Sequence, residues 1–250
     1  LSLLPAAAIA LPPDTRRIAL RGDDALLLAP PAQAALEQRV LAALEVFHAR
    51  APDEAGPELW RLKRIVDAEM EDALWSHLVA GLLARGEILA RGASLHLPTH
   101  SVELTPQEQA VADPLLAALE QGRADPPWTR DLAREFGLAE DETRRLLRKL
   151  AKAGQISQVV HDLFYHQAAL AELAQLVRTL TEKAETDDGL APGSGAVGAA
   201  TFRDASGLGR KRAIQILEFF DRVGYTRRVG NGHLLRPQAL WSYTAALPNS

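Results

Sequence analysis

The sequence predicts a mainly α-helical fold with small β-hairpins, organised as tandem winged-helix domains. Two observations lead to this prediction. First, hairpin-like stretches recur along the chain, with turns centred near Gly22, Gly92, Asp162 and Asn231, which are 70, 70 and 69 residues apart. Second, three helix-like runs precede each of the last three hairpins. Three helices followed by a hairpin make the winged-helix form of the helix-turn-helix.

The first hairpin, residues 16–30, has no helices before it, so residues 1–31 are expected to be the remnant of a first winged helix. The chain begins with Leu rather than Met, and we expect it to be a piece of a longer protein. Its opening residues are apolar but short and are interrupted by proline, so they predict neither a signal peptide nor a membrane span.

Three complete units are expected to follow: a second winged helix over 32–102, a third over 103–166 and a fourth over 167–240. Their expected helices lie at 31–50, 56–66 and 69–86, then 105–122, 126–137 and 139–154, then 167–185, 200–207 and 209–224. In the third unit Thr105 is a predicted N-cap before Pro106 at the first helical position. The Gly-rich residues 186–200 predict a mobile loop in the fourth unit.

A glycine stands between the last helix and the hairpin of each complete unit, at Gly86, Gly154 and Gly224. Glycine at this place is typical of a left-handed residue that ends a helix. The four tryptophans, Trp60, Trp75, Trp128 and Trp241, are expected to fill small cores or to lie at contacts between units.

Composition excludes several kinds of chemistry. The 250-residue chain contains no cysteine, so disulfides, Cys-based zinc sites and thiol catalysis are ruled out. His96 and His100 are expected where a strand ends and a loop begins, and no third ligand completes a metal site with them. We therefore expect no enzymatic activity and no metal in this chain, and a cytoplasmic monomer with no membrane partner.

Positive charge is concentrated near the C-terminus. The formal net charge is −4, yet residues 201–236 hold eight basic and three acidic residues, or +5, which leaves −9 for the rest of the chain. Local charge rather than net charge decides where a polyanion binds. The sequence therefore indicates a nucleic-acid site in the fourth unit.

The last predicted helix has an apolar stripe (Ala213, Ile216, Leu217, Phe220 and Val223) and an opposite solvent stripe that includes Lys211 and Gln215. Arg210, Lys211 and Arg212 lie at its N-terminus, where positive side chains oppose the helix dipole. That arrangement favours an external anion such as phosphate. In the hairpin, Arg227 and Arg228 alternate and should face opposite sides. Tyr225 is expected in the core, although it could stack on a base.

The stretch "FRDASGLGRKRAIQILEFFDRVGYTRRVGNGHLLRP" (202–237) resembles the last winged helix of the bacterial selenocysteine-specific translation elongation factor family, and "LWRLKRIV" and "PPWTRDLAREFG" resemble its earlier ones. The resemblance implies that the last unit grips an mRNA hairpin at a UGA codon. The implied RNA-binding residues, with Gln215 added from the solvent stripe, are Phe202, Arg203, Gly209, Arg210, Lys211, Arg212, Gln215, Arg227, Arg228 and Asn231.

In this family an N-terminal GTPase part carries GTP and selenocysteinyl-tRNA to the ribosome. The present chain has no phosphate-loop motif, so the resemblance gives it no GTP site and no cofactor. Side chains read the narrow major groove of A-form RNA poorly. We therefore expect phosphate and 2′-OH contacts along a stem, together with recognition of unpaired bases.

Other interpretations stay open at this point. The fold alone is compatible with a DNA-binding winged-helix regulator, and the first three units could act as a spacer. A second basic helix, residues 143–152, is either a solvated face or a contact with tRNA, ribosomal RNA or another domain.

Overall fold

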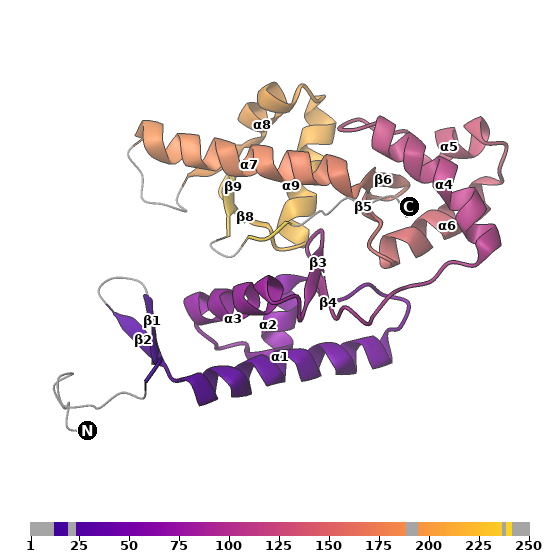
Figure 1. Ribbon diagram of the computed structural model, residues 1–250. Helices are drawn as coiled ribbons and strands as arrows, with labels where there is room; N and C mark the ends of the chain where they lie inside the picture. Colours follow the sequence, from indigo (N-terminus) through magenta and orange to yellow (C-terminus); the bar gives the residue numbers. More distant parts are fainter. Residues whose placement is uncertain (1–12, 20–23, 189–194, 237–238, 242–250) are drawn as a thin grey trace.

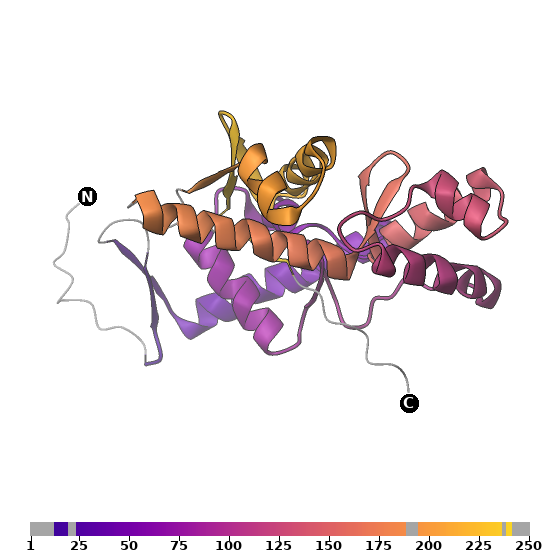
Figure 2. The same ribbon diagram turned by 90° about the horizontal axis from the view of Figure 1, so that it is seen from above.

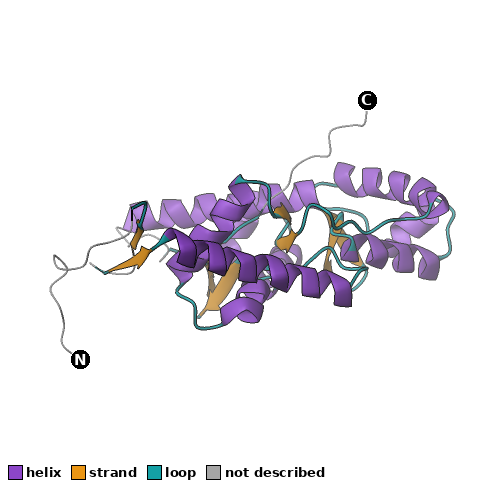
Figure 3. Cartoon of the chain, turned by 60° about the horizontal axis from the view of Figure 1, so that its bottom comes forward, coloured by secondary structure: helices purple, strands orange, loops and turns teal. Residues whose placement is uncertain are grey.

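The computed structural model describes residues 13–19, 24–188, 195–236 and 239–241. Most of the described chain is helical, and the strands are short pieces between the helices (Figure 3). The fold class predicted from the sequence is confirmed, because three helices followed by a hairpin recur along the chain. The predicted turn at Gly22 and the loop centre at 189–194 lie outside the described residues.

The second unit comprises α1 (Pro30–Arg50), α2 (Leu59–Asp67), α3 (Asp72–Ala84), β3 (Leu89–Arg91) and β4 (Ser94–His96). Its core is an apolar cluster in which Val40, Leu44, Leu62 and Trp75 are fully buried. The preceding hairpin, β1 (Arg16–Ala19) and β2 (Ala25–Leu28), is antiparallel and contacts α3 (Figure 1). Ile18 and Leu28 are its buried residues, so this hairpin uses the second unit as its partner.

The third unit comprises α4 (Pro106–Gln121), α5 (Thr129–Glu135), α6 (Glu140–Lys152), β5 (Ile156–Val160) and β6 (Leu163–His166). Thr105 is the N-cap of α4, as predicted. Its hydroxyl accepts from the Glu108 amide at 3.2 Å, and the Glu108 carboxylate accepts from the Thr105 amide at 2.8 Å, which completes a capping box.

The fourth unit comprises α7 (Gln167–Asp188), β7 (Ala196–Gly198), α8 (Ala199–Ser206), α9 (Arg210–Arg222), β8 (Thr226–Val229) and β9 (Gly232–Leu235). Its sheet has the order β7-β9-β8. The expectation of a loop over the whole of 186–200 is wrong at both ends. Helix α7 runs to Asp188, and β7 pairs with β9, so residues 196–198 satisfy their backbone groups in the sheet.

The three predicted helix-ending glycines all have left-handed backbone, with φ of 70° at Gly86, 73° at Gly154 and 77° at Gly224. Gly224 has a second reason to lack a side chain. A Cβ at this position would lie 2.3 Å from the Trp60 ring, because α2 of the second unit packs directly on it. The repeated glycine therefore ends a helix in all three units and also makes a contact between units in the fourth.

The third and fourth units share one hydrophobic core. Val159, Leu163 and Tyr165 of β5 and β6 belong to the same buried cluster as Leu170 of α7 and Phe220 of α9. Helix α7 follows β6 without an intervening loop and extends along the molecule, with α8 and α9 on one of its sides (Figure 2). The two units are therefore held in a fixed relation by apolar packing.

The second unit meets this pair through polar contacts and close backbone approach. The Arg91 guanidinium donates to the Ala153 carbonyl at 2.8 Å, and the Ala55 amide donates to the Lys152 carbonyl at 2.7 Å. The Lys152 ammonium forms an ion pair with Asp53 at 2.5 Å. These contacts place β3 and residues 53–55 beside the C-terminal end of α6, while Trp60 of α2 packs on Gly224 just after α9.

Candidate nucleic-acid interface

The start of α9 is an open helix N-terminus. Gly207 has a φ of 70° and ends α8, and Gly209 is the extended N-cap residue of α9. No side chain caps α9, and its first turn contains no acidic residue. The first amide groups of a helix have no partner within the helix, so they are available to an anion.

The apolar stripe of α9 fixes the direction in which its basic residues point. Ala213, Ile216, Leu217 and Phe220 are fully buried, as predicted. Phe219, which the sequence pattern did not indicate, is buried as well. Arg210 and Lys211 are exposed as a consequence, and within the described residues no carboxylate lies within ion-pair distance of either side chain. We call Gly209, Arg210, Lys211 and Gln215 the helix-start cluster.

A groove of about 440 Å³ lies against the helix-start cluster. Its other wall comes from the third unit, where Asp125 and Trp128 face Gly207 and the cluster. The groove combines an aromatic ring with two exposed cations at a helix N-terminus. Such a combination suits a planar base attached to a phosphate.

Arg212 also lines this groove, but its side chain is mostly buried against the third unit. Its guanidinium forms an ion pair with Asp125 at 2.7 Å and lies over the Trp128 ring, 5.3 Å from the ring centre. Only 14% of its side chain is exposed. Arg212 therefore ties α9 to the third unit at one wall of the groove, and its predicted RNA contact stays a prediction.

The predicted RNA contact of Phe202 does not fit the structure. The residue is fully buried in the core shared by the third and fourth units, so it has no surface to offer a ligand. Arg203, the next residue on α8, is partly exposed and forms an ion pair with Asp204, with 2.7 Å between Nε and Oδ1. Phe202 is therefore a core residue, whereas Arg203 lies on the surface of α8.

The wing presents Arg227, Arg228 and Asn231 to solvent. Strand alternation sends Arg227 and Arg228 to opposite faces, yet both are exposed, because β8 is the edge strand and extends past the core. Tyr225, at the base of the wing, is core, as preferred from the sequence: its hydroxyl donates to the Ala174 carbonyl at 2.9 Å, and burial raises the pKa of the phenol.

A polar group that the sequence did not single out anchors the wing to α9. Asp221, in the last turn of α9, accepts from the Thr226 hydroxyl at 2.6 Å and pairs with Nδ1 of His233 at 2.8 Å. Thr226 and His233 are both buried. An acidic residue twelve positions before a histidine in a hairpin gives no recognisable spacing, so only the fold brings them together.

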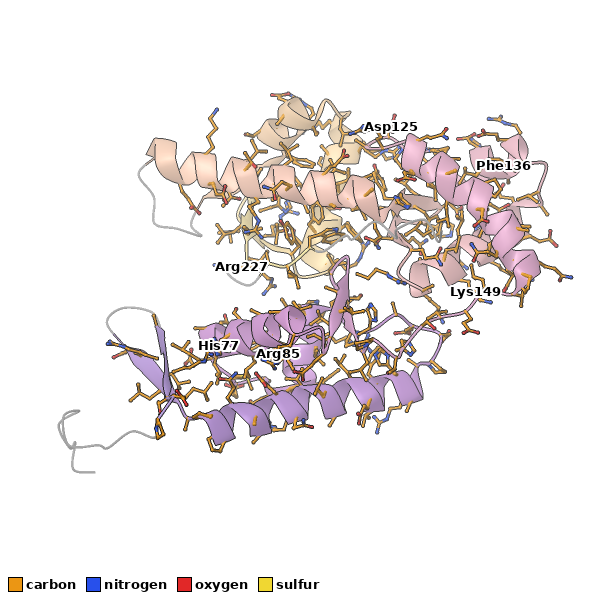
Figure 4. All side chains as sticks on the ribbon, viewed as in Figure 1. His77, Arg85, Asp125, Phe136, Lys149 and Arg227 are labelled. Carbon is orange, nitrogen blue, oxygen red and sulfur yellow. The ribbon has the colours of Figure 1, made fainter. Side chains whose placement is uncertain are left out.

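The structure separates the predicted site residues into two places. The 13-residue helix α9 is about 20 Å long, and the helix-start cluster lies at its beginning, while β8 begins beyond its end. Figure 4 shows Asp125 of the third unit, which pairs with Arg212 near the start of α9, beside the upper side of the fourth unit, and Arg227 at its lower side. Arg227 is on the side that faces the second unit.

The second basic helix, α6, is largely neutralised within the protein. Arg144 donates to Asp162 at 2.6 Å and also pairs with Glu140, while Lys149 pairs with Glu108 at 2.6 Å. These contacts raise the pKa of Arg144, and hydrogen bonding to Lys149 lowers the pKa of Glu108 to about 2. Lys152 pairs with Asp53 of the second unit. The basic helix was expected to be either a solvated face or a contact with RNA or another domain, and for Lys152 the structure shows a contact with another unit.

His96 ends β4 and His100 lies in the following loop, as expected. Within the described ranges no three His, Asp or Glu side chains gather so that they could hold a metal ion. Among the helices of the described residues, none combines the length and apolar character needed to cross a bilayer.

The repeated helices and wings, with an exposed basic helix start in the last unit, define a tandem winged-helix protein of the nucleic-acid-binding type. Three family models match it: "Elongation factor SelB, winged helix" at residues 41–97 and again at 190–235, and "Selenocysteine-specific elongation factor, winged helix domain" at 112–165. The chain belongs to the selenocysteine-specific elongation factor (SelB) family and corresponds to its winged-helix part.

Curated relatives agree with this assignment. The chain is 37% identical over 218 residues to the selenocysteine-specific elongation factor of Escherichia coli K12, a match that covers 86% of this chain and 33% of that protein. It is 29% identical over 199 residues to the Haemophilus influenzae factor, covering 80% of this chain and 30% of the relative. The chain thus spans about a third of the length of the curated relatives it matches.

A solved structure is also similar. The mRNA-binding domain of E. coli elongation factor SelB, determined in complex with SECIS RNA, is 41% identical and is covered to 99%, while the match covers 53% of this chain. Its TM-score of 0.44 reflects a limited overall superposition.

Proposed function

We propose that this chain binds an mRNA hairpin through the fourth unit and thereby tethers a selenocysteine-specific elongation factor to the message at a UGA codon. The observation that carries the proposal is the helix-start cluster, where exposed Arg210 and Lys211 flank an uncapped helix N-terminus beside an aromatic-lined groove. Family membership supplies the class of ligand. The ribosome and selenocysteinyl-tRNA are partners of the whole protein in this proposal, and GTP belongs to its other part.

The proposed contact has two components. Amide groups at the start of α9 and the side chains of Arg210 and Lys211 hold backbone phosphates. The groove between Trp128 and the helix-start cluster receives an unpaired base from a loop or bulge, because the base edges of an A-form stem are poorly accessible in its deep groove. The wing residues Arg227 and Arg228 lie too far from this groove to touch the same nucleotide, and we assign them to phosphates further along the stem.

The test replaces both exposed cations of the helix-start cluster, Arg210→Ala with Lys211→Ala. Hairpin affinity is expected to fall, and the slope of log affinity against log salt is expected to decrease by about one for each phosphate that the variant no longer holds. The matched control is Arg16→Ala with Arg17→Ala, an exposed pair on the distant β1 strand. Fluorescence anisotropy across a salt series measures both quantities. Equal behaviour of the two double variants contradicts the proposal.

A duplex-DNA competitor separates this function from that of a DNA-binding regulator. The cations of α6 in the third unit are mostly paired within the protein, which leaves the fourth unit as the exposed basic one. The second and third units then serve to set the reach of the fourth. We expect hairpin RNA to be bound in preference to DNA by a monomer acting in the cytoplasm; efficient displacement by DNA would favour the regulator.

A further inference from the structure

A second basic site lies at the other end of α9, where the second, third and fourth units meet. A cavity of about 460 Å³ occurs there, and its volume is in the range of about 300–1,000 Å³ that is usual for small-molecule sites. Five cations line it: Arg61 and Arg91 from the second unit, Arg148 and Lys152 from the third, and Arg222 from the fourth. We call it the junction cavity.

The junction cavity carries a net positive charge. Its lining contains two carboxylates, Glu54 and Glu58, against the five cations. Lys152 is paired with Asp53, but in the described parts of the chain no carboxylate lies within ion-pair distance of the four arginines. Arg91 and Arg222 donate instead to neutral backbone carbonyls, Arg91 to Ala153 and Arg222 to Gln158 and Val159.

One buried donor in the walls also lacks a partner. The indole N–H of Trp241 is buried and has no hydrogen bond among the described residues, and Trp241 lines the cavity. The wall therefore has an unused donor next to a concentration of cations. A donor beside arginines suits an anion with several oxygen atoms.

We infer that the junction cavity is a phosphate-binding site, and that its ligand is a backbone phosphate of RNA. Arginines from three units repel one another when the units pack together, and a phosphate between them would offset that repulsion. The assignment to RNA rather than to free phosphate rests on the proposed function, whereas the phosphate site itself does not. The site is separate from the helix-start cluster, because the length of α9, about 20 Å, lies between them.

The test uses the full chain carrying Arg210→Ala and Lys211→Ala, so that the helix-start cluster does not contribute. Two probes are titrated: a blunt RNA duplex without loop or bulge, followed by anisotropy, and inorganic phosphate, followed by calorimetry. Arg148→Glu is expected to weaken binding at least about tenfold, as for removal of one charge-assisted hydrogen bond. Arg145→Glu is the control, since Arg145 is exposed on the same helix but outside the cavity.

The outcomes are distinct. Binding of the duplex that Arg148→Glu weakens and Arg145→Glu leaves within about twofold supports the inference. Binding of inorganic phosphate alone, with the same dependence on Arg148, keeps the phosphate site but overturns RNA as its source. Absence of both, or equal weakening in the two variants, overturns the site. Arg148→Gln, with thermal unfolding measured alongside, repeats the test without a reversed charge. None of these outcomes depends on hairpin recognition at the helix-start cluster.

Discussion

Gly209 is the residue at which helix capping and ligand binding compete most directly. It is the N-cap of α9, its backbone is extended, and a Cβ built on it meets nothing within 4 Å. Neither packing nor backbone strain therefore requires glycine here. A side chain at this position would instead occupy the space in front of the free amides of α9.

We predict that Gly209→Ser separates stability from binding. A serine N-cap accepts a hydrogen bond from the first turn and should raise the free energy of unfolding by a few tenths of a kcal/mol. The same hydroxyl takes the amides that a phosphate would use, so hairpin affinity should fall about tenfold, which corresponds to about 1.4 kcal/mol. Urea unfolding and anisotropy measure the two effects. Unchanged affinity would show that the start of α9 holds no phosphate.

At the scale of helices and strands, the position of the wing hairpin (β8 and β9) depends on contacts with the last turn of α9. Asp221 accepts from Thr226 and pairs with His233, one residue on each strand of the wing hairpin. This arrangement lets α9 set the position of the edge strand β8. The exposed arginines of β8 owe their placement to it.

Asp221→Ala is predicted to loosen the wing and to leave α9 intact. Removal of the carboxylate leaves two buried polar groups unpaired, at about 1–3 kcal/mol each before relaxation. Amides of β8 and β9 should therefore exchange hydrogen faster, with little change in the middle of α9. The control is Asp204→Ala, which removes an exposed carboxylate paired with Arg203. Equal protection of the wing amides from hydrogen exchange in both variants would contradict the role of Asp221 in holding the wing.

The helices and turns could be predicted well from the sequence, and the site only in part. Apolar periodicity in α9, the N-cap at Thr105 and the glycines before the last three wings are local patterns, and local patterns specify helices and turns. The role of Arg212 could not be predicted, because Asp125 and Trp128 come from another unit. Strand β7 could not be predicted because its three residues pair with β9, which lies far along the chain. The burial of Phe202 could not be predicted either, because a motif match does not distinguish a residue that contacts the ligand from a core residue beside it.

Across the molecule as a whole, the second unit packs on the fourth through Trp60 and Gly224. Both Gly224 and Gly86 are left-handed, with φ of 77° and 70°. A Cβ at Gly86 meets nothing within 4 Å, whereas at Gly224 it would overlap the Trp60 ring. The two glycines thus share one backbone requirement and differ in one contact between units.

We predict that Gly224→Ala lowers the free energy of unfolding more than Gly86→Ala does. Both variants carry the strain of alanine at positive φ, about 1 kcal/mol. Only the first also forces Trp60 away. In a Trp60→Ala background the excess should disappear, and the double-mutant cycle gives the coupling between the units. Chemical denaturation measures all four proteins. An excess that persists without Trp60 would place its cause within the fourth unit.

The core shared by the third and fourth units has a mechanical consequence. Because β6 passes directly into α7 and their buried residues belong to one cluster, a pull on the fourth unit cannot be absorbed by bending at the boundary between the two. We expect any bending of the molecule to occur instead between the second unit and this pair. They are joined by polar contacts around Ala55, Arg91 and Lys152 and by the packing of Trp60 on Gly224.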